Sequence, residues 1–396
     1  MMTWIGVSVF ALVLSYLGWG VIYQLIFSLA GLLWKENELP PVGKHRTLAV
    51  LIPAYKEDNV IVEVAAEALQ QDYPRNKLEV FVLADSLQEQ TLTQLDATGV
   101  ETITVSFEQS TKSKALNKAL EVIPENAFDI IVILDADNVM SPNFLSQING
   151  EFELGHRVVQ ACRAAKNFNT SMAVLDGISE AVNNHILCKG QMEFGLSARL
   201  AGSGMAFDAK LFRRVMPEID AIGGFDKALE LSLTNQGERI YYTEQANIYD
   251  EKVSKPEHFS RQRSRWIAAQ FHYARKFFPH ALGTFLKTGN IDYLNKATQM
   301  LLPPRLITPG ILAIGGILCW FLGYTELSIG FAVVLFFNII SFLIAMPAYS
   351  WQRPYIDALL RLPLVFLFAL RSLVGIGKAN KKFIHTPHGE TIETTK

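Results

Sequence analysis

The first 34 residues of the chain carry no charged side chain. The run from Met1 to Trp34 is far longer than the roughly 20 apolar residues that cross a bilayer as one helix. It lacks a basic segment at its start, and a signal-peptide core has only about 7 to 15 apolar residues. We therefore expect residues 1–34 to form a transmembrane anchor that the mature protein retains.

More apolar segments lie near the other end. The stretches Leu306–Thr325 and Leu327–Gln352 are each long enough to span as a helix. A third stretch, Tyr355–Ile376, contains three charged residues, which are Asp357, Arg361 and Arg371. We favour an interfacial or re-entrant segment there, because a crossing would put the basic tail, residues 378–396, outside. A true crossing is the alternative. Residues 306–377 are thus predicted to form transmembrane or interfacial helices.

Basic residues predict the orientation of these segments. They follow the span at 1–34, precede the span at 306–325 and follow the span at 327–352. The loop between the two late spans carries only Glu326. The basic residues are Lys35, Lys44, Arg46, Arg305 and Arg353. Since positive charge stays on the cytoplasmic side, we expect a multi-pass protein of the inner membrane with a cytoplasmic central domain.

Composition excludes other classes. Half of the 396 residues are hydrophobic, only 19% are charged, and the net charge is −2. No stripe of basic residues interleaved with aromatics indicates a nucleic-acid partner. The three cysteines, Cys162, Cys188 and Cys319, are scattered, which fits a reducing compartment and provides no disulfide framework or metal-ligand spacing.

Residues 47–290 are predicted to form one α/β domain. Short apolar runs of strand length alternate with segments of helical spacing, and the strand interiors are almost continuously apolar. The predicted strands are Leu48–Ile52, Glu79–Leu83, Thr102–Val105 and Ile130–Leu134; the predicted helices include Asp58–Gln71 and Ser113–Val122. This rhythm indicates a parallel sheet covered on both faces, with ligands at the carboxyl ends of its strands.

Acidic residues follow two of these strands. Asp85 comes just after the second strand, and Asp135 and Asp137 directly follow Leu134. Each alone is equally compatible with helix capping in a loop. Alternate residues of an extended segment point the same way, so the paired carboxylates favour a Mg²⁺ or Mn²⁺ ion that also holds a diphosphate.

These residues belong to a longer pattern that resembles the family 2 glycosyltransferases, in particular their membrane-embedded, processive polysaccharide-synthase branch. The matching segments are Ile52–Glu57, Asp85, Lys112–Asn117, Asp135–Asp137, Gly202–Met205, Gly224–Lys227 and Gln262–Trp266. The resemblance implies a GT-A fold, a nucleotide-diphospho-sugar donor and inversion at the anomeric carbon.

The resemblance also implies roles for the donor side. Asp85 would bind the base and ribose of the nucleotide, Asp135 would face the donor, and Asp137 would coordinate the metal ion. Lys114 would lie near the donor, and the uridine side would be cradled by Pro53, Ala54, Tyr55 and Glu57. Carboxylates accept hydrogen bonds from sugar and base, and the metal stabilises the leaving diphosphate.

Asp226 is the candidate general base, because an inverting transfer requires one carboxylate to remove the proton of the acceptor hydroxyl. The family usually has Glu or a close relative immediately before this Asp, whereas Phe225 stands here. Asp226 could instead serve only as a helix N-cap after Gly223 and Gly224. Glu230 is the alternative base.

The acceptor side is predicted from two further segments. Residues i and i+3 of a helix share a face, so Gln262 and Arg265 would project together, beside Arg263 and Trp266. An arginine suits a diphosphate, and an indole face suits a sugar ring. An amphipathic helix at a membrane surface would contain the same residue types. Small residues of the second segment would line the acceptor groove, namely Gly202, Ser203 and Gly204.

These features predict an inverting, metal-dependent glycosyltransferase that extends a cell-surface polysaccharide from a UDP-sugar. Expected partners are the nucleotide sugar, a glycan or lipid-linked acceptor and membrane lipids. Two alternatives are a non-processive transferase acting on a lipid or lipid-linked acceptor, and a non-catalytic subunit of an export complex. Self-association is also compatible with so few spans.

Overall fold

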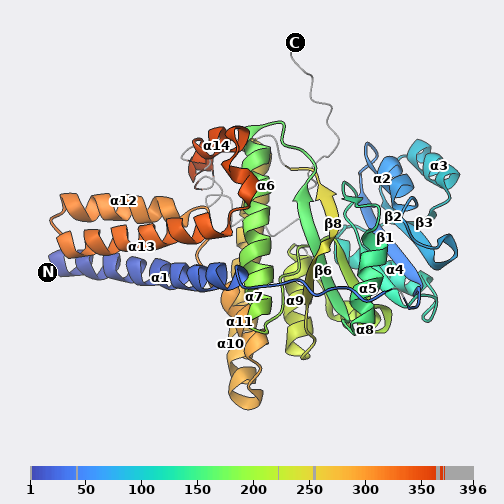
Figure 1. The fold of residues 1–396 in the computed structure, drawn as a ribbon, viewed down its shortest axis with the longest axis horizontal. Coiled ribbons are helices and arrows are strands. Elements are labelled where there is room, and N and C mark those ends of the chain that lie inside the picture. Colours follow the sequence, from blue (N-terminus) through green and yellow to red (C-terminus); the bar gives the residue numbers. More distant parts are fainter. Residues whose placement is uncertain are drawn as a thin grey trace, which may run out of the picture.

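The computed structural model describes residues 2–41, 43–221, 223–252, 256–362, 366–368 and 370. Within them, an eight-stranded sheet has the strand order β3-β2-β1-β4-β7-β6-β8-β5 (Figure 1). The strands are β1 (Leu48–Tyr55), β2 (Leu78–Asp85), β3 (Glu101–Val105), β4 (Ile130–Ile133), β5 (Val139–Met140), β6 (Val158–Ala165), β7 (Met205–Asp208) and β8 (Tyr241–Asp250).

The sheet is mixed rather than parallel, which corrects the prediction. Strands β3, β2, β1 and β4 are parallel as expected, but β7 pairs antiparallel with both β4 and β6, and β5 pairs antiparallel with β8. The reason is local. The chain arrives at β7 beside the carboxyl end of β4, where Gly204 N donates to Ile133 O over 2.9 Å, so β7 must run back along β4.

Helices cover both faces of the sheet and extend beyond it. They are α1 (Met2–Gly31), α2 (Ile61–Ala68), α3 (Glu89–Thr98), α4 (Lys112–Val122), α5 (Phe144–Glu153), α6 (Ser171–Asn184), α7 (Gly190–Glu193), α8 (Ala209–Val215), α9 (Phe225–Asn235), α10 (Pro256–Thr288), α11 (Ile291–Gln299), α12 (Thr308–Phe321), α13 (Thr325–Ala345) and α14 (Arg353–Leu359). One core contains side chains of α2, α3 and α5, and the other contains side chains of α4, α8 and α9.

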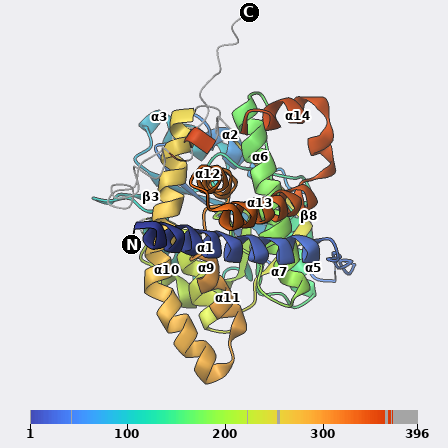
Figure 2. The same cartoon turned by 90° about the vertical axis from the view of Figure 1, so that its left-hand side faces the viewer.

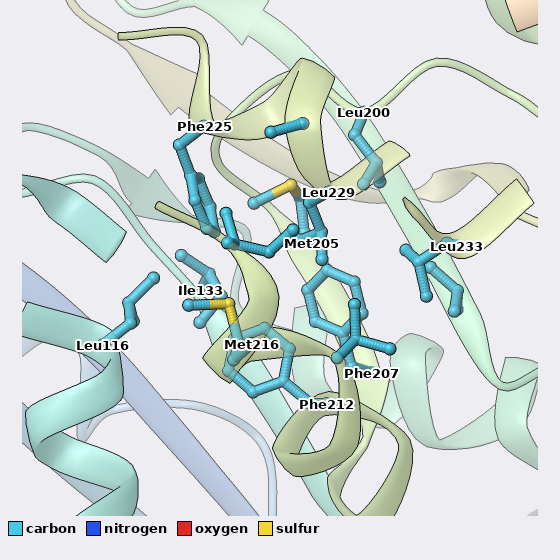
Figure 3. Packing of buried hydrophobic residues seen from close by; sticks show 14 of the residues in the cluster. Leu116, Ile133, Leu200, Met205, Phe207, Phe212, Met216, Phe225, Leu229 and Leu233 are labelled. Carbon is cyan, nitrogen blue, oxygen red and sulfur yellow. The ribbon is translucent and has the colours of Figure 1, made fainter. Parts of the chain in front are cut away.

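The second core fixes the position of α9. Figure 3 shows Phe225 and Leu229 of this helix among Met205, Phe207 and Phe212, which come from β7 and α8. Phe225 is only 6% exposed. The helix that carries the candidate base in its first turn is therefore anchored to the sheet by its apolar side.

Three apolar helices project from this domain. Figure 1 shows α1, α12 and α13 side by side at the end of the molecule remote from β3, and Figure 2 shows α6 and α10 on either side of them. In the described residues, Trp4–Gly31 and Thr325–Ala345 are long and apolar enough to cross a membrane. The predicted span at 306–325 is wrong in length, because α12 has 14 residues and is about 21 Å long, shorter than a bilayer core.

The chain after α13 differs from the predicted long span. The helix ends at Ala345, and a 3-10 turn over Ala348–Trp351 leads into the short α14. The third apolar stretch is described only in part, and the predicted tail at 378–396 lies outside the described residues.

Helix α1 contacts both the helices of the sheet domain and the apolar helix α13. Tyr23 Oη donates to Asn295 Oδ1 over 2.8 Å, and Gln24 Nε2 donates to Ser341 Oγ over 2.6 Å. Gly190 meets α1 so closely that a Cβ there would lie 2.1 Å from the carbonyl oxygen of Phe27. The backbones of α1 and α7 touch because Gly190 has no side chain.

We expect Gly190→Ala to destabilise the protein by about 1 to 3 kcal/mol, because the added methyl forces α1 and α7 apart. Gly283→Ala in α10 is the matched control, since a Cβ at Gly283 meets no atom within 4 Å. The measurement is thermal unfolding of the detergent-solubilised protein. Equal midpoints for the two variants would contradict the close contact.

Candidate functional site

The first cluster of predicted residues lies where β1 and β2 end. Tyr55 and Asp85 are register partners, and Lys56 N donates to Asp85 O over 3.1 Å. Pro53 and Ala54 are the preceding residues of β1, which continues three residues beyond the predicted end, and Glu57 is buried just after it. The parallel register therefore brings Asp85 beside the Pro53–Glu57 segment, as the sequence predicts.

Both chain turns at this edge adopt an uncommon backbone conformation. Lys56 and Ser86 have positive φ angles of 57° and 59°, which non-glycine residues rarely adopt. Ser86 Oγ donates to Asp85 Oδ1 over 2.9 Å, and Asp58 Oδ1 accepts from Gln88 N over 2.7 Å. These bonds hold Asp85, only 3% exposed, in one position at the sheet edge.

The acid pair follows β4 and is bound to the turn before β7. Asp135 N donates to Ser203 Oγ over 2.9 Å, and Ser203 Oγ donates to Asn138 Oδ1 over 2.5 Å. Asn138 Nδ2 in turn donates to Asp137 Oδ1 over 2.9 Å. Ser203 thus connects the Gly202–Gly204 segment to the acid pair. It does so through its hydrogen bonds with Asp135 N and Asn138 Oδ1.

Lys112, rather than the predicted Lys114, reaches the acid pair. Lys112 Nζ contacts Asp135 Oδ1 in an ion pair and donates to Gly202 O over 2.7 Å. Lys114 Nζ donates instead to Gln109 O over 3.0 Å, on the exposed side. Two residues differ by about 200° around a helix, so the two side chains of α4 point in different directions.

Two residues that were not predicted from the sequence, Gln160 and Arg163, lie beside this cluster. Gln160 Nε2 donates to Ser203 O over 3.0 Å, and Gln160 Oε1 accepts from Ala201 N over 2.8 Å. Arg163 Nη2 donates to Asp250 Oδ2 over 2.6 Å. Burial alone would lower the pKa of Arg163, but Asp250, Glu180, Asp135 and Asp137 together raise it. Arg163 therefore stays positive beneath the acid pair.

The acid pair fits a hard divalent cation only together with a ligand. Among the described residues, no group of three or more His, Cys, Asp or Glu side chains is arranged to hold a metal ion. Mg²⁺ is commonly held by one or two carboxylates with substrate phosphates and water completing its shell. Asp135 and Asp137 meet that description, with Asp137 largely buried and Asp135 partly open.

Asp226 lies in the first turn of α9. The N-cap is Gly224, with a left-handed φ of 68°, so Asp226 is not the N-cap. Helix α10 fixes this turn, because a Cβ on Gly224 would lie 2.9 Å from Ala269 Cβ, and Tyr273 Oη donates to Gly223 O over 2.9 Å. Asp226 is partly exposed, with Lys227 Nζ 3.5 Å from its Oδ2.

Glu230, the alternative base, is engaged in the core. Its Oε2 accepts from Leu200 N over 2.6 Å, and its Oε1 lies 3.7 Å from Lys296 Nζ. Burial raises the pKa of Glu230, although Lys296 opposes the rise. Its contacts favour a structural role over contact with an acceptor.

The predicted basic-aromatic cluster lies in α10. Arg263 Nη2 donates to Asp176 Oδ1 over 2.6 Å, and its guanidinium lies 4.5 Å from the ring centre of Trp266. Trp266 is 38% exposed. Gln262 is partly buried, and burial lowers the pKa of Arg265, with Arg261 adding to the effect.

A cavity of about 220 Å³ joins the cluster to Asp226. Asp226, Arg263 and Trp266 line it together with residues of the apolar helices. These include Val21 and Gln24 of α1 and Phe342 of α13. Neither Gln262 nor Arg265 is among the lining residues.

Most of the predicted residues form two groups, and Lys114, Gln262 and Arg265 belong to neither. The first group is joined by strand register and by hydrogen bonds at the sheet edge; it contains Pro53, Ala54, Tyr55, Glu57, Asp85, Asp135, Asp137, Gly202, Ser203 and Gly204. The second group lines the cavity. The two approach each other at Lys112, whose Nζ contacts Asp135 and lies 6.0 Å from the ring centre of Phe225.

Comparison with known proteins gives consistent matches. Residues 45–269, more than half of the chain, match the family model described as "Glycosyltransferase like family 2". The probable glycosyltransferase YdaM of Bacillus subtilis is 24% identical over 256 residues, which cover 62% of this chain and 59% of that protein. The chain thus matches less than two thirds of the length of this curated relative.

A solved structure shares the fold over most of the chain, and a second one has a lower overall similarity. The mannosyltransferase PcManGT from Pyrobaculum calidifontis, in complex with GDP-Man and Mn²⁺, has a TM-score of 0.52 at 18% identity, covering 85% of this chain and 98% of that one. Glucosyl-3-phosphoglycerate synthase from Mycobacterium tuberculosis, in complex with Mn²⁺, UDP and phosphoglyceric acid, has a TM-score of 0.38 at 19% identity, covering 52% and 72%.

Proposed function

The chain belongs to glycosyltransferase family 2 and is a glycosyltransferase with a GT-A-like fold, and we propose that it transfers a sugar, with inversion, from a UDP-sugar to a membrane-associated acceptor. One observation carries this proposal. Asp85, Asp135 and Asp137 gather at the carboxyl edge of the sheet, while Asp226 opens into a separate cavity beside the apolar helices. We take the sheet edge as the donor site and the cavity as the acceptor site.

The donor edge supplies the contacts that a nucleotide diphosphate needs. Asp85 would accept hydrogen bonds from base and ribose, and Asp137 would hold Mg²⁺ or Mn²⁺. When bound, the ion would offset the charge of the departing diphosphate. Lys112 would add a positive charge beside Asp135 and orient that carboxylate.

The acceptor side supplies a base. Asp226 would take the proton of the acceptor hydroxyl as the oxygen attacks the anomeric carbon and the bond to the diphosphate breaks. Trp266 would support the acceptor sugar with its ring face. Gln262 and Arg265 are the chain neighbours of Arg263 and Trp266 but do not line the cavity, so they would contribute through α10 rather than through direct contact.

We propose insertion in the inner membrane with the sheet domain in the cytoplasm; the apolar helices support the insertion, and the basic residues beside them support the orientation. Large apolar side chains of α1 and α13 are exposed along most of their length, including Trp4, Leu12, Ile22, Ile329 and Phe336. Contiguous apolar surface of this extent is costly in water and stable in lipid.

Two acceptors follow from different observations. The family resemblance favours extension of a cell-surface polysaccharide. The cavity favours single addition to a lipid-linked acceptor, because its wall continues onto α1 and α13. Product length separates them: a ladder of products supports the polymer, and one added sugar supports the lipid-linked acceptor.

The donor is tested by thermal unfolding of the purified protein with a panel of nucleotide sugars and Mn²⁺. We expect UDP-sugars with Mn²⁺ to raise the unfolding midpoint, since a ligand that binds only the folded state stabilises it. The same UDP-sugars without Mg²⁺ or Mn²⁺ should have little effect. Stabilisation by GDP-mannose alone would contradict a UDP-sugar donor. No response to any nucleotide sugar would contradict the proposed donor site.

A further inference from the structure

Three arginines line the cavity beside Asp226, which is unusual for a chamber that borders apolar helices. They are Arg199, which follows α7, Arg263 on α10, and Arg305, which precedes α12. Arg199 Nη2 lies 2.5 Å from Glu180 Oε1, and Arg263 Nη2 lies 2.6 Å from Asp176 Oδ1. Each of these two positive charges therefore has a carboxylate partner.

Arg305 has a different environment. Its Nη2 donates to the neutral amide oxygen of Asn183, and no carboxylate among the described residues forms an ion pair with it. Its Nη1 is buried without a hydrogen-bond acceptor in the described part of the chain. Burial, together with the positive charges of Arg199 and Arg263, lowers the pKa of Arg305 to about 10, although Glu180 opposes the fall. A buried cation of this kind is stabilised by an anion.

Other unpaired donors surround the same chamber. Arg199 Nε, Arg263 Nε and Gln299 Nε2 are buried without acceptors among the described residues. The carboxylates in the wall are Asp226, beside Lys227, and Glu230, whose pKa is raised by burial. Several N–H donors with few free acceptors are suited to an oxyanion with many acceptor oxygens, such as a phosphate.

The rest of the wall is apolar and belongs to the membrane side. It includes Val21 of α1, Phe342 of α13, and Leu306 and Ile307 beside Arg305. Residues 21–24 lie in the second half of the long apolar helix, toward the sheet domain. A phosphate bound at Arg305 would therefore lie where lipid chains can approach it, in the same cavity as Trp266 and Asp226.

We propose that this cavity binds the phosphate or diphosphate group of a lipid-linked sugar, with Arg305 as its principal ligand. The inference rests on the proposed function, because the attached sugar would be the acceptor. Its hydroxyl oxygen would form the new bond to the anomeric carbon, its proton would pass to Asp226, and UDP would leave. Arg305 would position the acceptor and take no part in bond making.

The test measures binding of farnesyl phosphate, farnesol and inorganic phosphate to the full-length protein in detergent. We expect wild-type protein to bind farnesyl phosphate at least about tenfold more tightly than the other two. Arg305→Gln should lose about tenfold or more of the farnesyl phosphate affinity, the loss typical of a charged hydrogen bond, with Arg305→Lys intermediate. Arg275→Gln, an exposed arginine of α10, is the matched control.

Binding of UDP with Mn²⁺ separates the possible failures. Unchanged UDP binding in Arg305→Gln shows an intact fold and a donor site independent of Arg305. Weaker UDP binding in that variant would assign the arginines to the nucleotide and overturn the inference. If farnesol bound as tightly as farnesyl phosphate, the proposed phosphate contact would be contradicted. If inorganic phosphate bound as tightly as farnesyl phosphate, the proposed lipid contact would be contradicted. If the wild-type protein did not bind UDP with Mn²⁺, the proposed function itself would be contradicted.

Discussion

Asp137→Asn is expected to lower sugar transfer by a factor of about 10³, the loss that follows when several kcal/mol of charge stabilisation by a metal ion disappear. Asp137 is the largely buried member of the acid pair and receives a hydrogen bond from Asn138 Nδ2 over 2.9 Å. An amide at this position is a poorer ligand for a hard cation than a carboxylate. The measurement is transfer from radiolabelled UDP-sugars in membranes containing the variant.

The same variant should also lose the metal dependence of UDP binding, which distinguishes a ligand from a residue that only supports the loop. Asp96→Asn, an exposed acid on α3, is the control for the substitution itself. Its transfer rate and UDP binding should match those of the wild type. Undiminished transfer by Asp137→Asn would contradict the proposed role of Asp137 as a metal ligand.

The position of the acids at the carboxyl edge of the sheet could be predicted because that geometry is local. A strand that is apolar on both faces must lie inside a covered sheet, and its next residues must emerge at the carboxyl edge. Asp85, Asp135 and Asp137 follow from that argument. Lys112 was missed because both lysines belong to one motif, and only the phase of α4 decides which reaches Asp135.

The cavity could not be predicted, because its walls come from distant parts of the chain. Arg305 is far from Asp226 in sequence, and its role depends on how α1, α10 and the segment before α12 pack. Hydropathy gave the apolar segments but not their lengths. In the predicted span at 306–325, helix α12 covers only the 14 residues Thr308–Phe321. Its side chains pack against those of α1 and α13.

Phe225 shows why a departure from a family pattern can be harmless to the neighbouring residue. Consecutive residues of a helix are about 100° apart, so Phe225 and Asp226 face different directions. Phe225 fills the core beside Met205 (Figure 3). Asp226 lines the cavity. The residue before the candidate base is therefore a packing residue in this chain, and it leaves the carboxylate accessible.

Asp226→Asn is accordingly expected to reduce transfer by a factor of about 10² to 10⁴, the range for loss of one general base, while UDP binding stays unchanged. The amide occupies nearly the same volume, so α9 and its packed Phe225 should be undisturbed. Single-turnover transfer and UDP binding by calorimetry measure the two effects on the same preparation. Asp220→Asn, an exposed acid just before this turn, is the matched control and should transfer normally.

Glu230→Gln separates the two candidate bases. Because Glu230 accepts from Leu200 N and lies near Lys296, this variant should lower the unfolding midpoint, whereas Asp226→Asn should not. If Asp226→Asn lost UDP binding together with transfer, the carboxylate would be structural. If it kept full transfer while Glu230→Gln lost transfer and remained folded, the base would be Glu230. Selective loss of transfer in Asp226→Asn alone would leave Asp226 as the group that receives the acceptor proton.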